Sequence, residues 1–506
     1  MIRVKSAFNL GIHAFPIDIE VDIGGGIPQL IIVGLPDASI KEAKERVRTA
    51  IKNSGFQTPS EKITISLAPA DLKKEGASFD LPIALGILAC HGIIPQEKLN
   101  EYIFLGELAL DGSIRPFKGA LAITANFRNH AFIVPNENAE EAAMAKDVTV
   151  YPVKTLKETV EYLTEAQIIQ PIRKYSYRQN PPTNPASDFS DVKGQRAVKR
   201  AIEIAVAGNH KILFIGPPGS GKTMLAKRVP TILPSMDIEE ALEITKIHSV
   251  AGATAGGKSL LRERPFRSPH YTASAAAIAG GGTEARPGEV SLAHGGVLFL
   301  DEFPEFRRDV LETLRGPLED GTITISRAKT QVTYPANFLL VAAMNPCPCG
   351  HLGDPRKTCR CSLGKIHKYQ SRISGPILDR IDIQIEVPAL SFKTLTGQET
   401  PESSATIRNR ICQCRKAQMA RYRQRPYRTN SQMSPKDIKN FATPDIEGRK
   451  LLELAMKDLH LSARAYYKVL KIARTIADLA ACEEIRAKHI AEAIQYRSLD
   501  RQWWNG

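Results

Sequence analysis

Residues 216–223, GPPGSGKT, have the spacing of a loop that binds nucleotide phosphates. An apolar run, KILFI, precedes them and a run with helical spacing follows, which is the context that such a loop requires. Its glycines let backbone N–H groups approach phosphate oxygens, its lysine neutralises the β- and γ-phosphates, and its threonine ligates Mg²⁺. A glycine-rich turn without a ligand is the alternative. The predicted nucleotide-binding residues are Gly216, Pro217, Pro218, Gly219, Ser220, Gly221, Lys222 and Thr223.

Two adjacent carboxylates, Asp301 and Glu302, end a second apolar run, VLFL. Carboxylates at the carboxyl end of a parallel strand suit the remaining tasks of phosphoanhydride hydrolysis. Asp301 would complete the Mg²⁺ shell with Thr223, and Glu302 would orient and activate the attacking water. Without a phosphate loop, a solvated carboxylate pair would be the simpler interpretation. The loop favours the catalytic one.

Three further side chains are catalytic candidates. A third apolar run, NFLLVAAMN, ends at Asn345, whose amide would reach the attacking water from a neighbouring strand. Arg380 follows a helical stretch, and Arg464 begins a helix near the C-terminus. Most arginines lie on the surface, which is the alternative for both. In an oligomeric ATPase, however, a guanidinium from a neighbouring subunit stabilises the charge on the transferred phosphoryl group.

Four cysteines form two CxC pairs shortly after the third apolar run. Four thiolates suit a tetrahedral Zn²⁺ ion, although the spacing is tighter than the usual CxxC. Free reduced thiols are the alternative. Cys412 and Cys414 form another CxC pair, but on a predicted helix residues i and i+2 face apart, so no site is expected there. The candidate zinc ligands are Cys347, Cys349, Cys359 and Cys361.

These side chains need a framework that brings them to one edge of a sheet. Apolar strand runs alternate with helices over residues 191–395, which predicts a parallel α/β sheet. Residues 396–506 have almost wholly helical spacing and are predicted to form a helical lid. Residues 1–168 mix alternating and helical runs, which predicts an α+β domain, and the proline-rich residues 169–190 are predicted to be a linker. The fold class is therefore multidomain α/β.

Length and composition agree with this division. The 506 residues exceed one ordinary core, and 43% hydrophobic with 24% charged residues exclude disordered, collagen-like and membrane-spanning classes. The first residues lack the apolar stretch of an export signal, so a cytoplasmic location without membrane contact is expected. Lys and Arg outnumber Asp and Glu by 68 to 54, and the net charge of +14 favours a polyanionic partner. A solvated basic surface is the alternative.

The order of the motifs resembles that of the magnesium-chelatase-like AAA+ ATPases, and in particular the ComM/YifB family. The likeness rests on GPPGSGKT, VLFLDE, NFLLVAAMN, ILDRID and LSARAYYKVLKIARTIA, and extends to VKSAFNLGIHAFPIDIEVDI near the N-terminus. It implies a homo-hexameric ring that binds ATP and Mg²⁺, with Arg380 reaching a neighbour's ATP and Arg464 as a second sensor. It also implies DNA branch migration in homologous recombination during natural transformation, alongside partners such as a recombinase.

The N-terminal domain resembles the S5-type fold of Lon proteases. The segment EGASFDLPIALGIL would place the catalytic serine at Ser78. A serine–lysine dyad needs a lysine as base, but Leu121 stands at the matching position and Lys118 is displaced by three residues. We therefore expect an inactive protease fold that serves oligomerisation or DNA contact, with Ser78 as a helix cap.

Three segments concentrate basic residues that would contact DNA. Residues 322–335 alternate like a hairpin with Arg327 and Lys329 near its turn, which would track phosphates in the pore of a ring; a solvated tip is the alternative. Arg267 and Tyr271 lie in a long glycine- and alanine-rich segment, where DNA contact and packing are equally open.

The third segment, residues 408–436, has nine basic residues, no acidic one and two interleaved tyrosines, so nucleic-acid contact and a solvated face stay open.

The main functional hypothesis is an ATP-driven motor that acts on single-stranded and branched DNA as a helicase or translocase. Two other classes remain: an ATP-dependent protein remodeller or Lon-type protease, and a chelatase-type motor for metal insertion. All three predict ATP hydrolysis.

Overall fold

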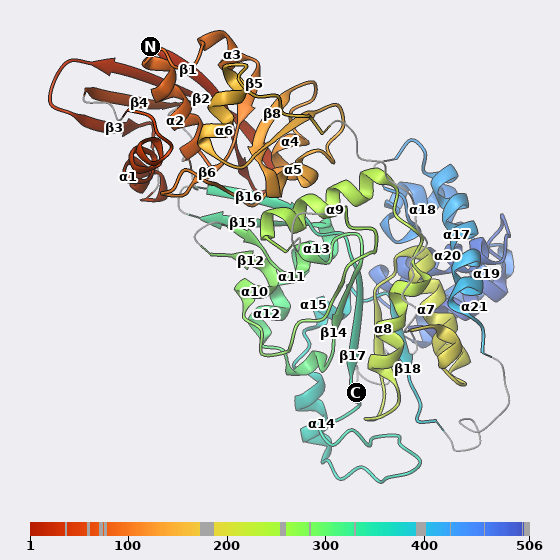
Figure 1. Cartoon of the computed structure of the whole chain (residues 1–506). Coiled ribbons are helices and arrows are strands. Elements are labelled where there is room, and N and C mark those ends of the chain that lie inside the picture. Colours follow the sequence, from red (N-terminus) through yellow and green to blue (C-terminus); the bar gives the residue numbers. More distant parts are fainter. Residues whose placement is uncertain are drawn as a thin grey trace.

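The computed structural model describes most of the chain in three consecutive parts: an N-terminal mixed-sheet domain, a central parallel sheet with helices on both faces, and a helical C-terminal region (Figure 1). The side chains at positions 38, 39, 41, 327 and 330 are not described. The described residues are 1–35, 38–57, 61–69, 74, 78–172, 187–253, 260–282, 285–327, 330–390, 401–425, 427–459, 461–497 and 499.

Five parallel strands form the central sheet, in the order β11-β14-β17-β10-β18. Every residue of β10, β14 and β17 is buried. Continuous apolar runs predict this burial, because a parallel sheet is covered on both faces. Since β17 lies between β10 and β14, the carboxyl ends of these three strands are adjacent. The strands are β10 (Ile212–Ile215), β11 (Phe266–Arg267), β14 (Val297–Leu300), β17 (Leu339–Met344) and β18 (Ile383–Glu386).

Helices pack on both faces of this sheet. One face, with Phe214 and Phe299, shares an apolar core with α7, α8 and the C-terminal helices. The other face, with Leu213 and Leu298, packs against α10 to α13. The helices of this part are α7 (Arg196–Gly208), α8 (Lys222–Ile232), α9 (Ile238–Ala251), α10 (Ala275–Ala279), α11 (Glu289–Leu292), α12 (Arg308–Thr313), α13 (Arg315–Asp320), α14 (Leu363–Gln370) and α15 (Gly375–Leu378).

A β-hairpin formed by β15 (Thr322–Arg327) and β16 (Thr330–Pro335) follows α13. Its strands pair from Thr322 with Pro335 up to Arg327 with Thr330, so the hairpin predicted from the sequence is confirmed. Two smaller strands, β12 (Gly280–Gly281) and β13 (Arg286–Pro287), pair nearby.

The N-terminal domain contains a four-stranded sheet in the order β1-β2-β4-β3 and a parallel three-stranded sheet, β5-β8-β9. Helix α2 is buried over almost its whole length against β1 and β2. Its strands are β1 (Ile2–Leu10), β2 (His13–Gly24), β3 (Gln29–Val33), β4 (Lys62–Ala68), β5 (Tyr102–Phe104), β6 (Glu107–Leu108), β7 (Ile114–Arg115), β8 (Ala131–Pro135) and β9 (Thr149–Val153). Its helices are α1 (Ala38–Asn53), α2 (Asp80–Cys90), α3 (Gln96–Asn100), α4 (Ala120–Thr124), α5 (Asn136–Ala142) and α6 (Leu156–Leu163).

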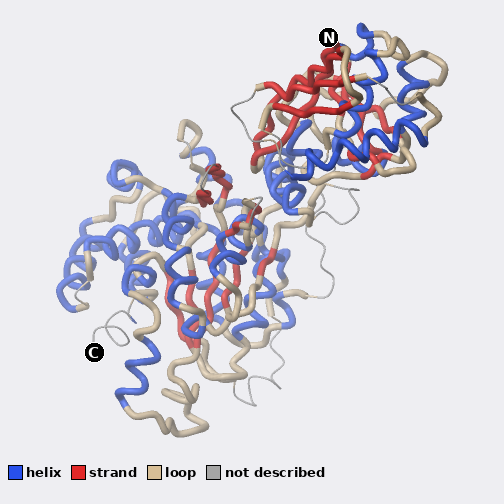
Figure 2. The backbone as a smooth tube through the Cα atoms, turned by 90° about the vertical axis from the view of Figure 1, so that its left-hand side faces the viewer, coloured by secondary structure: helices blue, strands red, loops and turns tan. Residues whose placement is uncertain are grey.

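This domain lies at one end of the molecule in both views (Figures 1 and 2), and it packs on the central part through α4 and α9. Leu121 of α4 shares an apolar core with Ile244 of α9. Within this joint the buried Glu141 accepts hydrogen bonds from the Leu121 backbone and from the Ser249 hydroxyl, and burial raises the pKa of Glu141. The two parts therefore share a packed interface.

The β1–β2 turn makes a second joint, with the hairpin. A Cβ atom on Gly11 would lie 2.4 Å from Val332 and 3.4 Å from Tyr334, so the turn backbone rests directly on β16. Ile12 of the same turn is buried in the core that contains these two hairpin residues.

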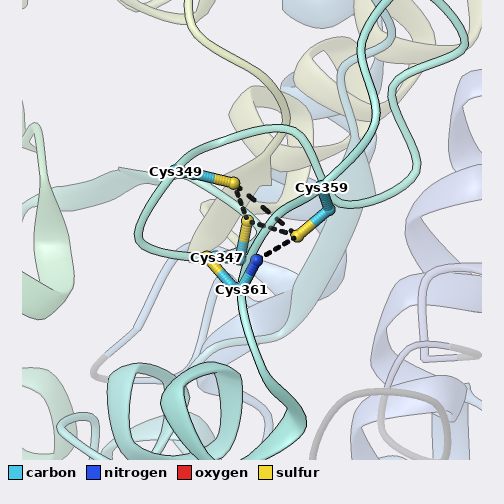
Figure 3. Close-up of side chains that lie close together, drawn as sticks. All are labelled: Cys347, Cys349, Cys359 and Cys361. Atoms are coloured by element: carbon cyan, nitrogen blue, oxygen red, sulfur yellow. Dashed lines mark hydrogen bonds between the residues drawn. The ribbon is translucent and has the colours of Figure 1, made fainter.

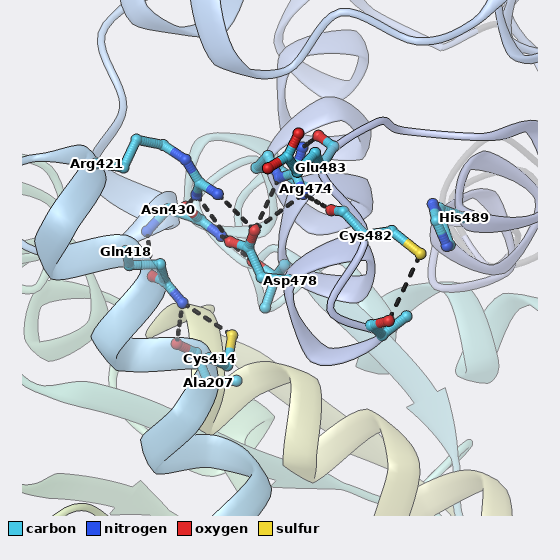
Figure 4. A network of polar contacts seen from close by, with 12 residues as sticks. Ala207, Cys414, Gln418, Arg421, Asn430, Arg474, Asp478, Cys482, Glu483 and His489 are labelled. Atoms are coloured by element: carbon cyan, nitrogen blue, oxygen red, sulfur yellow. Dashed lines mark hydrogen bonds and ion pairs between the residues drawn. The ribbon is translucent and has the colours of Figure 1, made fainter.

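The C-terminal helices are joined to the central part by buried polar contacts (Figure 4). Gln418 donates to the carbonyl of Ala207 at the end of α7, at 2.9 Å. Arg421 and Arg474 both bind the buried carboxylate of Asp478. The helical character predicted for residues 396–506 is confirmed for the described part of this region. The elements are α17 (Ser404–Arg421), α18 (Pro435–Phe441), α19 (Ile446–Asp458), α20 (Ala463–Leu479) and α21 (Ala487–Gln495).

Ser78 does not cap α2: the N-cap is Phe79, without a side-chain cap bond, and Ser78 contributes only its carbonyl, to the backbone N–H of Gly106. Most of the predicted linker, residues 173–186, lies outside the described part of the chain. Among the described helices, none is both long and apolar enough to cross a membrane.

Candidate nucleotide-binding site

The phosphate loop joins the end of β10 to the start of α8. Gly219 and Gly221 have φ angles of 73° and 92°, a backbone conformation that side chains with a Cβ rarely adopt. Lys222 is 8% exposed, and its Nζ donates to the carbonyls of Gly216 and Pro217 at 2.7 and 3.0 Å. Burial lowers the pKa of this ammonium to about 8, and the negative charge of Asp301 opposes that shift.

The two predicted Mg²⁺ ligands lie side by side. The Thr223 hydroxyl donates to Oδ2 of Asp301 at 2.7 Å. A hydroxyl and a carboxylate at this separation are the oxygen ligands that Mg²⁺ uses beside nucleotide phosphates. Glu302 follows at a φ of 53°, in the left-handed region, because the chain turns sharply after β14. Its backbone N–H donates to Oδ1 of Asp301, which fixes that carboxylate.

Asn345 lies between the lysine and the carboxylates because its strand, β17, is paired with β10 on one side and β14 on the other. Its Oδ1 accepts a hydrogen bond from Lys222 Nζ at 3.1 Å. The structure thus brings the predicted residues Lys222, Thr223, Asp301, Glu302 and Asn345 to one edge of the sheet.

A cavity of about 320 Å³ opens beside the phosphate loop, lined by residues 195–198 and 388–390. Gln195 connects this cavity to the phosphate loop. Its Nε2 donates to the carbonyl of Pro388 at 2.8 Å and to that of Ser220 at 3.4 Å. Two buried atoms here, Gln195 Oε1 and Ser220 Oγ, have no hydrogen-bond partner among the described residues. Buried polar atoms normally have partners, so this place fits a polar ligand such as the base and phosphates of a nucleotide.

The sequence did not reveal this cavity. Neither residues 195–198 nor residues 388–390 carry a recognisable motif. The left-handed backbone of Gln195 was the one local sign, and it becomes visible only in the structure.

Arg380 and Arg464 lie at the other edge of the sheet. The parallel register pairs Ile212 with Ile383, so the start of β18, which Arg380 precedes, lies beside the start of β10. Four strand residues separate that edge from the phosphate loop, about 13 Å at about 3.3 Å per residue. Arg380 binds Glu319 and the carbonyl of Pro376.

Arg464 lies in the same neighbourhood as Arg380. It is 3.7 Å from Asp379, the residue before Arg380, and its side chain is 66% exposed. The structure therefore brings the two predicted arginines together, away from the phosphate loop of their own chain.

The four cysteines converge in a loop directly after Asn345 (Figure 3). The Sγ atom of Cys347 lies 3.4 Å from that of Cys349 and 3.7 Å from that of Cys359, and all four sulfurs lie within 4.8 Å of one another. Four thiolates at about 2.3 Å from a tetrahedral Zn²⁺ ion would lie about 3.8 Å apart. Backbone N–H groups lower the pKa of Cys349 to about 6. This cluster can hold Zn²⁺.

The other CxC pair is ordinary, as expected: Cys414 is buried in the core and Cys412 is partly exposed on the same helix.

Of the predicted DNA contacts, the two in the glycine- and alanine-rich segment are engaged within the chain. Arg267 makes two hydrogen bonds of 2.6 Å to Glu289, and Tyr271 packs against the core beneath it with His270 on its ring. The packing alternative fits both residues. At the hairpin tip, the Arg327 backbone ends β15, while its side chain and Lys329 lie outside the described part of the chain.

Four of the nine basic residues in the run at 408–436 form ion pairs with acidic residues outside the run. Arg410 binds Glu203, and Tyr422 is 2% exposed. The paired side chains hold the helical region together and join it to the central part. For the exposed Lys416, Arg423 and Lys436, both the solvated-face and the nucleic-acid interpretations stay open. The other ion pairs are Arg421 with Asp478, Arg425 with Asp437 and Arg428 with Asp237.

A leucine, Leu121, occupies the position that matches the base of a serine–lysine dyad. Leu121 is fully buried in the joint with α9. The exposed Lys118 lies against Gly252, where a Cβ atom would meet its Cε at 2.8 Å. Both positions therefore serve the joint between the two parts.

Three family patterns match this chain in succession. Residues 188–395 match "Magnesium chelatase, subunit ChlI", residues 19–138 match "Subunit ChlI of Mg-chelatase", and residues 401–497 match "Magnesium chelatase, subunit ChlI C-terminal". The nucleotide site described above lies within the first match.

Several whole-length relatives are also similar. "Uncharacterized protein YifB" of Escherichia coli (strain K12) is 43% identical over 97% of this chain and 96% of its own. "Competence protein ComM" of Haemophilus influenzae is 42% identical over 98% of this chain and 97% of its own. "Lon protease 2" of Bacillus subtilis (strain 168) is 27% identical over 38% of each chain. On this coverage and identity, the chain belongs to the magnesium-chelatase ChlI-like AAA+ ATPases, in the family that includes YifB and ComM.

Proposed function

We propose that this protein is an ATP-driven motor that forms a hexameric ring and moves branched or single-stranded DNA, with branch migration during natural transformation as its role. The observation that carries the proposal is the link between Arg380 and the hairpin. Glu319, which binds Arg380, belongs to α13, and α13 leads directly into β15. An arginine that responds to nucleotide is therefore held by the element that supports a candidate DNA-contacting hairpin.

The ATP chemistry follows from the phosphate site. Lys222 and the loop backbone would hold the phosphates, Thr223 and Asp301 would hold Mg²⁺, and Asn345 would position the attacking water beside Glu302. Mg²⁺ in this place neutralises charge on the β- and γ-phosphates. The cavity beside Gln195 would take the adenine base.

The placement of the two arginines supports an oligomer. Arg380 and Arg464 lie about 13 Å or more from their own phosphate loop, so neither is placed to contact the nucleotide of its own subunit. In a closed ring each would face the nucleotide of the next subunit, where a guanidinium stabilises the transferred phosphoryl group. The name of the Haemophilus relative supports the role in competence.

The N-terminal domain is proposed to be a Lon-like fold that has lost its protease activity. The buried Leu121 stands where the base would be needed, and Lys118 is occupied at the joint. Without a base the serine hydroxyl stays a weak nucleophile. The domain would then serve as a structural partner of the hairpin rather than as an enzyme.

The test compares ATPase rates with single-stranded DNA, a four-way junction and casein under one set of conditions. Stimulation by DNA that is lost in an Arg327→Ala/Lys329→Ala double variant is expected, because a motor turns over faster on its substrate. Thr324→Ala and Thr333→Ala, lower on the same hairpin, are the matched controls. Stimulation by casein alone would replace the proposal with protein remodelling and reopen the question of Ser78.

A further inference from the structure

The cysteine loop, residues 347–361, touches the nucleotide site at its phosphate loop. Gly350 has a φ of 80°, and a Cβ atom there would lie 2.6 Å from Cδ of Pro218. The backbone of the cysteine loop therefore rests directly on the second proline of GPPGSGKT. A side chain at position 350 would push the two loops apart.

The loop also continues the strand that carries Asn345. Only Pro346 separates Asn345 from Cys347, which is fully buried. The Pro346 carbonyl accepts a hydrogen bond from Gln370 at 3.3 Å, and the buried Tyr369 shares an apolar core with Met344 at the end of β17. Helix α14, which follows the cysteine loop, thus holds the end of β17 in place.

A third contact reaches the segment after the catalytic carboxylates. Arg372, just beyond α14, binds Glu305 at 2.5 Å, three residues after Glu302. The chain from 347 to 372 therefore contacts all three polar segments of the site: the phosphate loop, the Asn345 strand end and the turn after Asp301.

The cysteine loop has no regular secondary structure of its own. It contains no helix or strand between residues 347 and 361, all of which the structure describes. The ion pairs of its described side chains are local, such as that of Arg356 with Asp354. A loop of this kind takes a fixed course when a metal joins its two ends, because the metal provides the free energy that ordering the chain costs.

We propose that a Zn²⁺ ion bound by Cys347, Cys349, Cys359 and Cys361 braces the ATP site, so that zinc occupancy sets nucleotide affinity. The ion fixes Gly350 against Pro218 and fixes the strand end that carries Asn345. The proposal rests on the proposed ATP-binding function and adds a determinant of that function that lies outside the phosphate-binding motif.

The experiment measures two quantities in the full chain: zinc content, by colorimetric release with a thiol reagent, and affinity for a fluorescent ATP analogue in excess Mg²⁺. We expect about one zinc ion per chain. Removal of zinc with a selective chelator should weaken nucleotide binding by about tenfold or more, and added Zn²⁺ should restore it. Removal and return of zinc need no substitution, so this part of the experiment does not depend on whether a variant folds.

Three variants separate the metal from the contact. Cys349→Ser should lose both zinc and affinity, whereas Cys412→Ser, the matched control outside the cluster, should keep both. Gly350→Ala should keep its zinc and still bind nucleotide weakly, because the added Cβ and the backbone strain at a φ of 80° act at the contact with Pro218 while all four thiolates remain. A variant that keeps its zinc but loses nucleotide affinity is not expected if the metal merely stabilises the fold.

Unchanged nucleotide affinity in zinc-free protein and in Gly350→Ala would overturn the brace and leave the ATPase proposal intact. Iron with visible absorbance in place of zinc would overturn the choice of metal. Failure of the zinc-loaded wild type to bind nucleotide would overturn the proposed function itself, and the brace with it.

Discussion

The carboxylate of Glu319 binds the guanidinium of Arg380, although 61 positions separate the two residues in the sequence. This contact lowers the pKa of Glu319, so the pair is charged at neutral pH. Arg380 is only 14% exposed, and its Nε is buried without a partner among the described residues. An arginine held in this way has little freedom, so its position follows that of α13 and the hairpin.

Mixed rings should reveal on which side of an interface Arg380 acts. Lys222→Ala and Arg380→Ala proteins are each expected to be inactive, but a mixture should regain ATPase activity. In a randomly mixed ring about a quarter of the interfaces combine an intact lysine with an intact arginine from the next subunit. A mixture of Arg464→Ala and Lys222→Ala proteins should regain ATPase activity in the same way. A mixture that stays inactive would contradict action between subunits.

The phosphate loop and the catalytic carboxylate should separate binding from turnover. Lys222→Ala is expected to lose nucleotide binding, because the ammonium that pairs with the phosphates is gone. Glu302→Gln should bind ATP almost normally but turn it over at least about a hundredfold more slowly, since an amide does not accept the proton of the attacking water. Binding of an ATP analogue and steady-state phosphate release measure the two effects. Wild-type turnover in either variant would contradict the assignment.

Nucleotide affinity should fall above about pH 8, because burial lowers the pKa of Lys222 to about 8 in the free protein. Phosphates attract the ammonium and not the neutral amine. Below the pKa the lysine is already charged and affinity is level; above it, binding must take up a proton and the Kd rises about tenfold per pH unit. Titrations of the ATP analogue from about pH 6.5 to about 9.5 test this. Lys222→Arg stays charged and should give a flat profile.

Restoring a lysine at position 121 should damage the fold rather than revive a protease. Leu121 is fully buried in the joint with α9, so an ammonium there loses its hydration. A buried lysine shifts its pKa by about 3 units or more, which corresponds to at least about 4 kcal/mol of lost stability at neutral pH. Denaturant unfolding measures the loss, and Leu121→Met, expected to cost less than about 1.5 kcal/mol, is the control. Casein cleavage by Leu121→Lys would contradict this interpretation.

Local patterns were sufficient to predict the centre of the site. The loop before Lys222 and the strands before Asp301 and Asn345 were predictable, because each motif combines a buried strand with polar residues at its end. The contact between Thr223 and Asp301 agrees with a parallel sheet, whose strands end at one common edge. The hairpin was also predictable, because its alternation spans both strands.

Contacts between distant segments were not predictable. Gln195 and Pro388 are 193 positions apart, and neither belongs to a pattern that names its partner. The ion pairs of the basic run at 408–436 were not predictable either, because acidic partners such as Glu203 lie in other helices. Ser78 was expected to cap α2, but the helix begins one residue later than a serine cap would require. Whether a charged side chain is paired, and where a helix begins, depends on which segments meet in the fold. The sequence of one segment does not reveal its partners.

The turn at Gly11 contacts the middle of the hairpin strand β16 at Val332 and Tyr334, while the tip of the hairpin carries Arg327. In a motor of the proposed kind the N-terminal domain then supports the hairpin along β16, and only the tip extends beyond that contact. The stiffness of the hairpin depends on how tightly the N-terminal domain packs against β16. The distance that the tip travels for one ATP depends on that stiffness. In the proposed motor, a domain that makes no contact with the ATP would thus help to set the length of each step.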